Sequence, residues 1–329
     1  MVTATKRLSR EASRKAENLS EFVSVVATVR DRWFDEEHPW GPWFRGQQRA
    51  SWGLLPKLFR GFGDYRRIKK DEIEDEIREE FAARAPILSE TRLAGSNSWG
   101  WYFQMQHFGA PTRLLDWTEG AHIALYFAVR DNPGYYDAAV WVLDPYELNR
   151  RAIGREEVIP PSEPNLRKRD RRVVDPWLPQ RFDPGTTVPD EPVAVYPTHV
   201  TRRIATQRSC FTVHGRDLAG LDRLQDKKER LLAKITIPSF RIRSIRKELE
   251  THGIDEVTVF PDLDGLGRAL CARWRLDSPA PPHVRVDALS SLVARHAAGA
   301  YWPHSCPTGT DAPGNLAPIV RVPAHKQHT

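Results

Sequence analysis

The hydrophobic residues of this chain fall into blocks whose spacing changes along the sequence. Residues 119–130 are apolar on every side of a helix, through Ala121, Ile123, Ala124, Leu125, Tyr126, Phe127, Ala128 and Val129. A block of this length predicts a buried helix, although periodicity alone also allows a buried strand. Because residues 107–118 before it are largely polar, the pattern predicts a polar loop at the start of a core element.

Amphipathic spacing predicts further helices. Residues 18–33 carry an apolar stripe, and Asn18 with Glu21 forms a capping box at its start. Apolar residues four apart at positions 73, 77 and 81 predict a helix with a solvated outer face. Residues 99–105 are expected to be helical or half-buried. Residues 240–251 predict a helix that ends before Gly253.

Runs of β-branched and aromatic residues predict the strands. They cover residues 43–45, 139–143, 193–196, 203–213, 232–237 and 256–260. Strands and helices in this order predict an α+β fold, with a mixed, twisted sheet and flanking helices. No internal repeat is visible.

Residues 150–192 differ in composition from their surroundings, since they combine prolines with a basic cluster at 167–172. Such a segment buries little apolar surface, so a linker or surface loop is the favoured interpretation. An ordered insertion over the site and a nucleic-acid contact are the alternatives. Residues 1–17 are expected to be a flexible lead-in and residues 278–329 a Pro-rich, disordered tail, which leaves 18–277 as one domain.

Composition narrows the class of protein without naming it. The 329 residues are 40% hydrophobic and 28% charged, as in a globular protein. The formal charge of +6 arises from 49 basic and 43 acidic residues, so it is only a weak indication of a polyanionic partner. The three cysteines are widely spaced, which favours a reducing cytoplasm over a disulfide framework or metal site. The sequence predicts neither a secretory signal nor a membrane span.

Two polar motifs carry candidate chemistry. Asp116 with Glu119 fits a capping box at the start of the apolar block, and Thr118 is a rival cap. Free backbone N–H groups there could bind an anion, although an ordinary loop and cap explain the same residues. Arg45 ends a short aromatic strand and precedes Gly46, a combination suited to phosphate. A surface Arg before a turn is the simpler interpretation of that motif.

A further acidic pair lies near the end of the predicted domain. Asp262 and Asp264 suggest a metal ion, but two carboxylates without further ligands are a weak site. We therefore interpret Asp262 as a helix cap, and the sequence predicts no metal ligands.

Taken together, these motifs resemble the FRG domain family. The resemblance is carried by Phe44-Arg45-Gly46-Gln47, by Trp52 to Pro56, and above all by residues 106–118. It extends through residues 203–212 and 260–266, and thus covers roughly residues 18–270. Ser209 departs from it, because the resemblance leads us to expect Gly at this position.

The resemblance implies a setting and an activity. FRG domains resemble components of bacterial and phage-related conflict systems, which implies a cytoplasmic toxin or anti-phage defence effector with an antitoxin or defence-system partner. Their motifs also resemble a diverged ADP-ribosyltransferase plan, which implies an ADP-ribosyltransferase-like fold, NAD as the consumed substrate, and a protein, RNA or DNA target.

In that plan the catalytic residues are Arg45, Asp116, Thr118 and Gln207. Arg45 holds the NAD phosphate or ribose, Thr118 with Asp116 shapes the nicotinamide pocket, and Gln207 replaces a late Glu that grips the ribose. The implied cofactor-binding residues are Arg45, Gly46, His107, Thr112, Arg113 and Thr118.

Gln207 also opens an alternative. A neutral Gln orients a hydroxyl but supplies no charge, so Asp116 is the alternative source of a carboxylate. The competing hypothesis is a non-catalytic FRG module that senses a ligand or binds nucleic acid with the same polar pocket. Under either hypothesis we expect Arg45, His107, Asp116 and Gln207 to line one cleft.

Overall fold

A computed structural model describes residues 14–35, 40–60, 70–88, 98–178, 189–197, 205–217, 219–224 and 230–274. The chain divides into units 1–276 and 277–329, and every described residue belongs to the first. The predicted tail, most of the predicted lead-in, residues 203–204 and part of the proline-rich segment lie outside the described residues.

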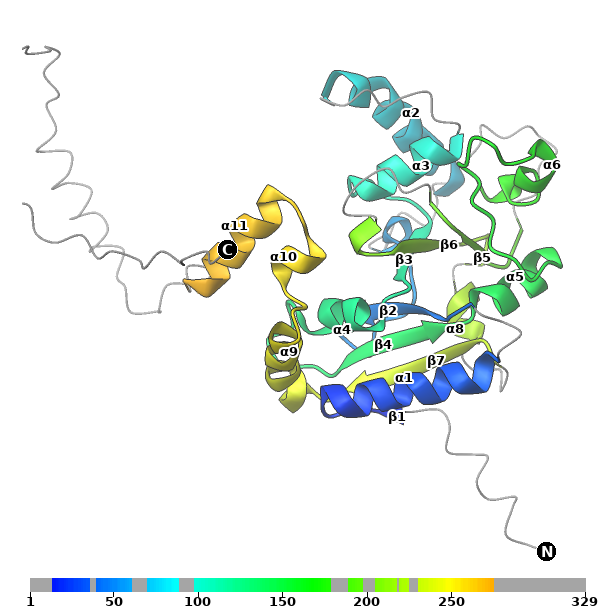
Figure 1. Cartoon of the computed structure of the whole chain (residues 1–329). Coiled ribbons are helices and arrows are strands. Elements are labelled where there is room, and N and C mark those ends of the chain that lie inside the picture. Colours follow the sequence, from blue (N-terminus) through cyan, green and yellow to red (C-terminus); the bar gives the residue numbers. More distant parts are fainter. Residues whose placement is uncertain are drawn as a thin grey trace, which may run out of the picture. The chain divides into compact units, whose positions relative to one another are not determined.

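The core of the fold is a mixed sheet of seven strands in the order β1-β7-β4-β2-β3-β6-β5 (Figure 1). β1 runs parallel to β7, and the other neighbours are antiparallel. The strands are β1 (Arg14–Lys15), β2 (Trp43–Gln47), β3 (Leu114–Thr118), β4 (Ala138–Leu143), β5 (Val193–Val195), β6 (Ser209–Val213) and β7 (Leu232–Ile237). The predicted α+β class with flanking helices is confirmed.

The sheet is nearly split between β2 and β3. The two strands share one residue pair, Phe44 with Thr118, whereas each pairs over five residues with its other neighbour. In a continued ladder Gly46 would lie opposite Asp116, but between these two strands only Phe44 and Thr118 pair. The sheet therefore consists of two half-sheets, β1-β7-β4-β2 and β3-β6-β5, which separate beyond this pair.

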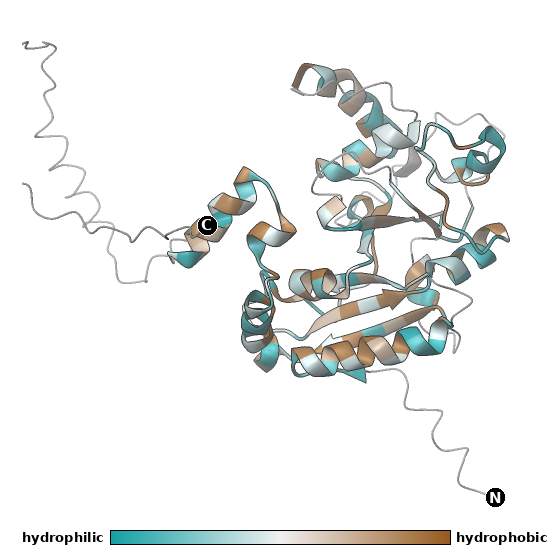
Figure 2. Cartoon of the chain, in the orientation of Figure 1, coloured by the Kyte–Doolittle hydropathy of each residue, from teal (hydrophilic) through white to brown (hydrophobic). Residues whose placement is uncertain are grey.

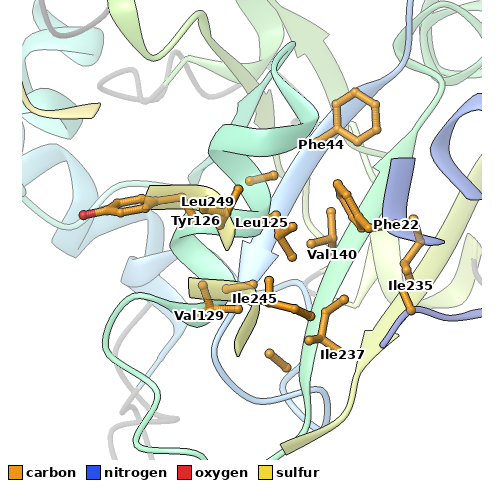
Figure 3. Packing of buried hydrophobic residues seen from close by; sticks show 14 of the residues in the cluster. Phe22, Phe44, Leu125, Tyr126, Val129, Val140, Ile235, Ile237, Ile245 and Leu249 are labelled. Atoms are coloured by element: carbon orange, nitrogen blue, oxygen red, sulfur yellow. The ribbon is translucent and has the colours of Figure 1, made fainter. Parts of the chain in front are cut away.

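Three helices cover one face of the first half-sheet. They are α1 (Leu19–Trp33), α4 (Ala121–Val129) and α9 (Ile242–Thr251), and they share one hydrophobic cluster with β2, β4 and β7. Figure 3 shows Phe22, Leu125 and Val140 directed into this cluster. Figure 2 shows hydrophobic residues concentrated on the central strands, while α1 alternates between hydrophobic and hydrophilic positions.

α4 confirms the predicted buried helix, but its cap differs from the prediction. Its N-cap is Gly120, which has no capping side chain of its own. The Gly120 amide donates to the Thr118 hydroxyl oxygen at 3.0 Å. The predicted capping box of Asp116 and Glu119 is wrong, because Asp116 belongs to strand β3 and lies too early in the chain.

The second half-sheet has its own hydrophobic cluster. Helices α2 (Lys70–Leu88) and α3 (Ser98–His107) pack there against residues of β3, β5 and β6. Val174, Trp177 and Leu178 of the proline-rich segment join the same cluster. The described part of that segment is therefore an ordered insertion, and the linker interpretation is wrong for it. A third cluster lies across both half-sheets and includes Trp43, Leu115, Trp117, Trp141, Leu143 and Cys210.

Shorter elements complete the described part of the chain. They are α5 (Pro145–Ile153), α6 (Lys168–Arg171), α8 (Gly220–Leu224), α10 (Glu256–Val259) and α11 (Leu263–Arg273), with 3-10 turns at Lys57–Phe59, Asp175–Trp177 and Ser239–Arg241. Among the described residues no helix has the length and apolar character needed to cross a bilayer.

Several local predictions are confirmed and others are wrong. Asn18 caps α1 by accepting from the Glu21 amide at 2.8 Å, and Asp262 caps α11 by accepting from the Gly265 amide at 2.7 Å.

Residues 256–260 were predicted as a strand, but helix α10 starts there because the Asp255 carboxylate accepts from the Thr258 amide at 2.8 Å. The loop predicted for residues 107–118 is wrong at its end, because Leu114–Thr118 form strand β3. The strand predicted from residue 203 begins only at Ser209.

Candidate functional site

The separation of β2 from β3 is bridged by the side chain of Arg45. Its Nη1 donates to the backbone carbonyl of Asp116 at 2.5 Å and lies 3.8 Å from the Asp116 Oδ2. Alternate residues of an antiparallel strand direct their backbone groups to the same neighbour, so Asp116 faces β2 as Thr118 does. The guanidinium of Arg45 therefore stands where the ladder between β2 and β3 would have continued.

The Asp116 carboxylate is both exposed and held in place. Its side chain is 60% exposed, and Gln106 Nε2 on α3 donates to its two oxygens at 2.9 and 3.0 Å. The amide oxygen of Gln106 accepts from the Thr112 hydroxyl at 2.5 Å, and Thr112 accepts in turn from the Leu114 amide at 3.1 Å. This chain of hydrogen bonds orients the Asp116 carboxylate beside Arg45 and leaves much of it exposed.

Arg45 is far less exposed than Asp116. Its side chain is 13% exposed, and burial lowers its pKa to about 10, against the opposing charge of Asp116. The guanidinium therefore stays charged at neutral pH. Within the described part of the chain its Nε has no hydrogen-bond partner. The site thus holds a cation beside an exposed carboxylate.

His214 is a neighbour of this site that the sequence analysis missed. Its ring is fully buried directly after β6. Burial lowers the pKa of His214 to about 3, and the charges of Arg45 and Arg113 add to the lowering, while the Leu54 backbone opposes it. His214 is therefore a neutral imidazole close to two cations. A single His after a predicted strand offered no signal of this placement.

Thr118 and Gln207 meet at the end of β3. The Thr118 hydroxyl donates to the Gln207 backbone carbonyl at 2.6 Å, and the Gln207 side-chain amide donates to the Val259 carbonyl at 3.2 Å. Both side chains thus make contacts that stabilise the turn before β6. The left-handed residue of that turn is Arg208, with φ of 47°, so Ser209 does not occupy a position that requires glycine.

Arg113 lies in a buried ion pair. Its Nε and Nη2 donate to Glu74 Oε2 at 2.6 and 2.5 Å, and the two side chains are 3% and 0% exposed. Tyr102 donates its hydroxyl hydrogen to the same Glu74 carboxylate. Glu74 belongs to the helix that was predicted to be amphipathic, and its burial was not foreseen. Arg113 is therefore committed to the interior, although it was expected to contact the cofactor.

Gly46 and His107 both make packing contacts. A Cβ added to Gly46 would lie 1.9 Å from the backbone oxygen of Ala124, so this glycine allows α4 to pack on β2. His107 ends α3 and packs edge-on against Phe108, with ring centroids 5.0 Å apart.

The described contacts connect several of the predicted site residues. The structure brings Arg45, Thr112 and Asp116 together, and it links Thr118 to Gln207. That Arg45, His107, Asp116 and Gln207 line a single cleft stays a prediction. Across the described residues no group of three or more His, Cys, Asp or Glu side chains could hold a metal ion.

Comparison with known protein families identifies a domain in the first half of the chain. Residues 41–135 match the FRG domain, a stretch that contains β2, α2, α3, β3 and α4 and hence Arg45, Gln106 and Asp116. No curated protein and no solved structure matches the chain.

Proposed function

We propose, starting from the FRG domain that this chain carries at residues 41–135, that the opening between β2 and β3 binds NAD and that the protein is an ADP-ribosyltransferase. The main support is the Asp116 carboxylate, which is 60% exposed and lies 3.8 Å from the guanidinium of Arg45. A fixed carboxylate beside a fixed cation matches the two charged parts of the proposed reaction.

The chemistry assigns one charge to each residue. NAD carries a diphosphate, which Arg45 binds through the planar donors of its guanidinium. Breaking the bond between ribose C1′ and the nicotinamide nitrogen leaves positive charge on the ribose, and Asp116 stabilises it as it develops. The electron pair of that bond leaves with nicotinamide. A nucleophile of a protein or nucleic-acid target then bonds to C1′ and releases its proton to solvent.

This assignment gives Asp116 the role that the family plan gives to a late Glu. Gln207 cannot supply the charge, and its amide already donates to the Val259 carbonyl. Thr118 supports the site by fixing the turn that leads into α4. The proposed setting, a bacterial toxin or anti-phage defence effector with a cognate partner, rests on the family resemblance alone.

One observation favours the second candidate, a non-catalytic ligand-binding module. Arg45 and Gln207 both donate to backbone carbonyls, which are structural contacts and require no substrate. In such a module the opening between β2 and β3 would bind a nucleotide without cleaving it.

Labelled NAD and a cell lysate separate the two candidates. With the wild-type protein we expect label to move to protein, RNA or DNA. Arg45→Lys should reduce transfer by about 10²–10³-fold, the range for loss of one preorganised electrostatic contact, because a Lys is a point charge without the planar donors.

Arg49→Lys is the matched control, because Arg49 is exposed and packs over Tyr136 with its guanidinium carbon 3.9 Å from the ring centroid. Transfer by this variant should equal that of the wild type. NAD binding by calorimetry without any transfer would support the module, and neither binding nor transfer would overturn both candidates.

A further inference from the structure

A cavity of about 460 Å³ lies between the end of α1 and the start of α5. It shares no lining residue with the opening between β2 and β3. Its walls combine aromatic rings with charged groups of both signs, among them Trp40, Tyr146, Asp144, Glu147, Arg150 and Arg151. Its volume falls within the usual range of small-molecule sites, about 300–1,000 Å³.

The aromatic wall of this cavity is an incomplete stack. The rings of Trp40 and Tyr146 are stacked, with centroids 5.7 Å apart and an interplanar angle of 29°. Tyr146 is 8% exposed, whereas Trp40 is 54% exposed. Tyr146 thus covers one face of the indole, and more than half of Trp40 stays exposed, so a third planar ring can stack on it.

The wall is also held in position before any ligand arrives. The hydroxyls of Tyr146 and Tyr196 are hydrogen-bonded, and the Tyr196 hydroxyl donates to Glu119 Oε1 at 2.9 Å. The Asp144 carboxylate accepts from the amides of Tyr146 and Glu147, both at 3.0 Å. Tyr146, the inner ring of the stack, is thus fixed and loses little freedom when a ligand binds.

The charges around the cavity do not form an anion site. Four carboxylates and three guanidiniums line it. Glu147 accepts from Arg150 at 2.6 Å and from Arg151 at 2.7 Å, which offsets part of the positive charge. The lining therefore offers hydrogen-bond donors and acceptors together and has no excess of positive charge. It suits a neutral polar ring better than a polyphosphate.

We propose that this cavity binds a nucleobase, presented by a free nucleoside or nucleoside monophosphate, stacked on Trp40. A nucleobase is planar and carries donors and acceptors on its edge. Carboxylates accept from its amino groups, and guanidiniums donate to its carbonyl and ring nitrogen atoms. The proposal does not depend on NAD cleavage at the opening between β2 and β3.

Isothermal titration calorimetry of the full chain tests this inference with guanosine, adenosine, their monophosphates and their triphosphates. We expect at least one nucleoside to bind. Trp40→Ala should weaken its affinity about tenfold or more, since a base then loses its stacking partner. Trp40→Phe should retain most of the affinity, because it keeps an aromatic face.

Charge gives a second expectation. Because the lining has no excess of guanidiniums, affinity should not rise from nucleoside to triphosphate. A steep rise with each phosphate, weakened strongly by salt, would show an anion site and overturn the proposal.

Two further variants locate the binding. Trp52→Ala removes an indole that is 47% exposed and lies outside the cavity, and it should bind like the wild type. Asp116→Asn should also bind like the wild type, which separates this cavity from the proposed NAD site. No nucleoside binding, or equal binding by Trp40→Ala with an unchanged melting temperature, would contradict the inference.

Discussion

Glu74 and Arg113 show how a residue from a candidate motif can be structural. Arg113 donates to Glu74 through two side-chain nitrogens, and its backbone amide donates to the same carboxylate at 3.1 Å. The pair lies inside the second half-sheet's hydrophobic cluster, where an unpaired charge is poorly solvated. This pair anchors α2 to the start of β3, directly before Asp116.

We therefore predict that Glu74→Gln destabilises the fold strongly. The change leaves the Arg113 charge buried without a counterion, which typically costs about 3–5 kcal/mol. The free energy of unfolding, measured by denaturant titration, should fall by this amount.

Glu80→Gln is the matched control on the same helix. Glu80 pairs with Arg84 at 2.8 Å, but the side chains are 62% and 73% exposed. The loss there should stay within about 1 kcal/mol, because water screens an exposed pair. Equal losses in both variants would show that the buried pair has no special weight.

At the scale of elements, the contact between α4 and β2 positions the candidate site. Phe44 and Gly46 face α4, and the chain between them carries Arg45 toward β3. A Cβ on Gly46 would meet the backbone oxygen of Ala124 at 1.9 Å and the backbone nitrogen of Ala128 at 2.7 Å. These are backbone atoms of a helix, so no side-chain rotation relieves the clash.

Gly46→Ala should consequently push α4 away from β2. We expect a loss of about 1–3 kcal/mol or more, as for an overpacked core, and the melting temperature should fall with it. Gly41→Ala serves for comparison, because a Cβ there has nothing within 4 Å and its φ is not positive. That variant should stay within about 0.5 kcal/mol of the wild type. A Gly46→Ala protein as stable as the wild type would contradict the packing role of this glycine.

Two of the wrong local predictions have identifiable physical causes. Residues 256–259 carry Val and Thr, which favour strands, yet the Asp255 cap and the ion pair of Glu256 with Arg130 at 2.9 Å hold them in a helix. In β3 the exposed Asp116 stands between buried Leu115 and Trp117, and a polar segment around it concealed the strand. Strongly periodic segments such as α1, α4 and β4 were predictable, because their burial pattern follows from local sequence.

The candidate site was predictable only in its residue types. The motifs identified Arg45 and Asp116, but their contact arises from sheet topology, which brings residues 71 positions apart together. The same topology placed His214 beside Arg45 and turned the Gln207 amide toward Val259. Sequence spacing contains none of these long-range relations.

Across the whole described domain, two half-sheets are joined by one residue pair, and Arg45 and Asp116 lie beside that junction. Each half-sheet has its own cluster of buried residues, and a third cluster joins them on one face. Arg45 and Asp116 both lie on strands, which favours a preorganised site over one formed by loops. We propose that this site cleaves NAD and that Asp116 supplies the negative charge that stabilises the ribose.

The most direct test is the rate of nicotinamide release from NAD by purified Asp116→Asn protein. Asn keeps the shape of the side chain and a hydrogen-bond acceptor but removes the negative charge. Asp131→Asn is the control, because that carboxylate is 59% exposed and lies after α4. We predict that Asp116→Asn releases nicotinamide about 10²–10³-fold more slowly than the wild type, while Asp131→Asn matches it. An Asp116→Asn protein that is folded and releases nicotinamide at the wild-type rate would contradict the account.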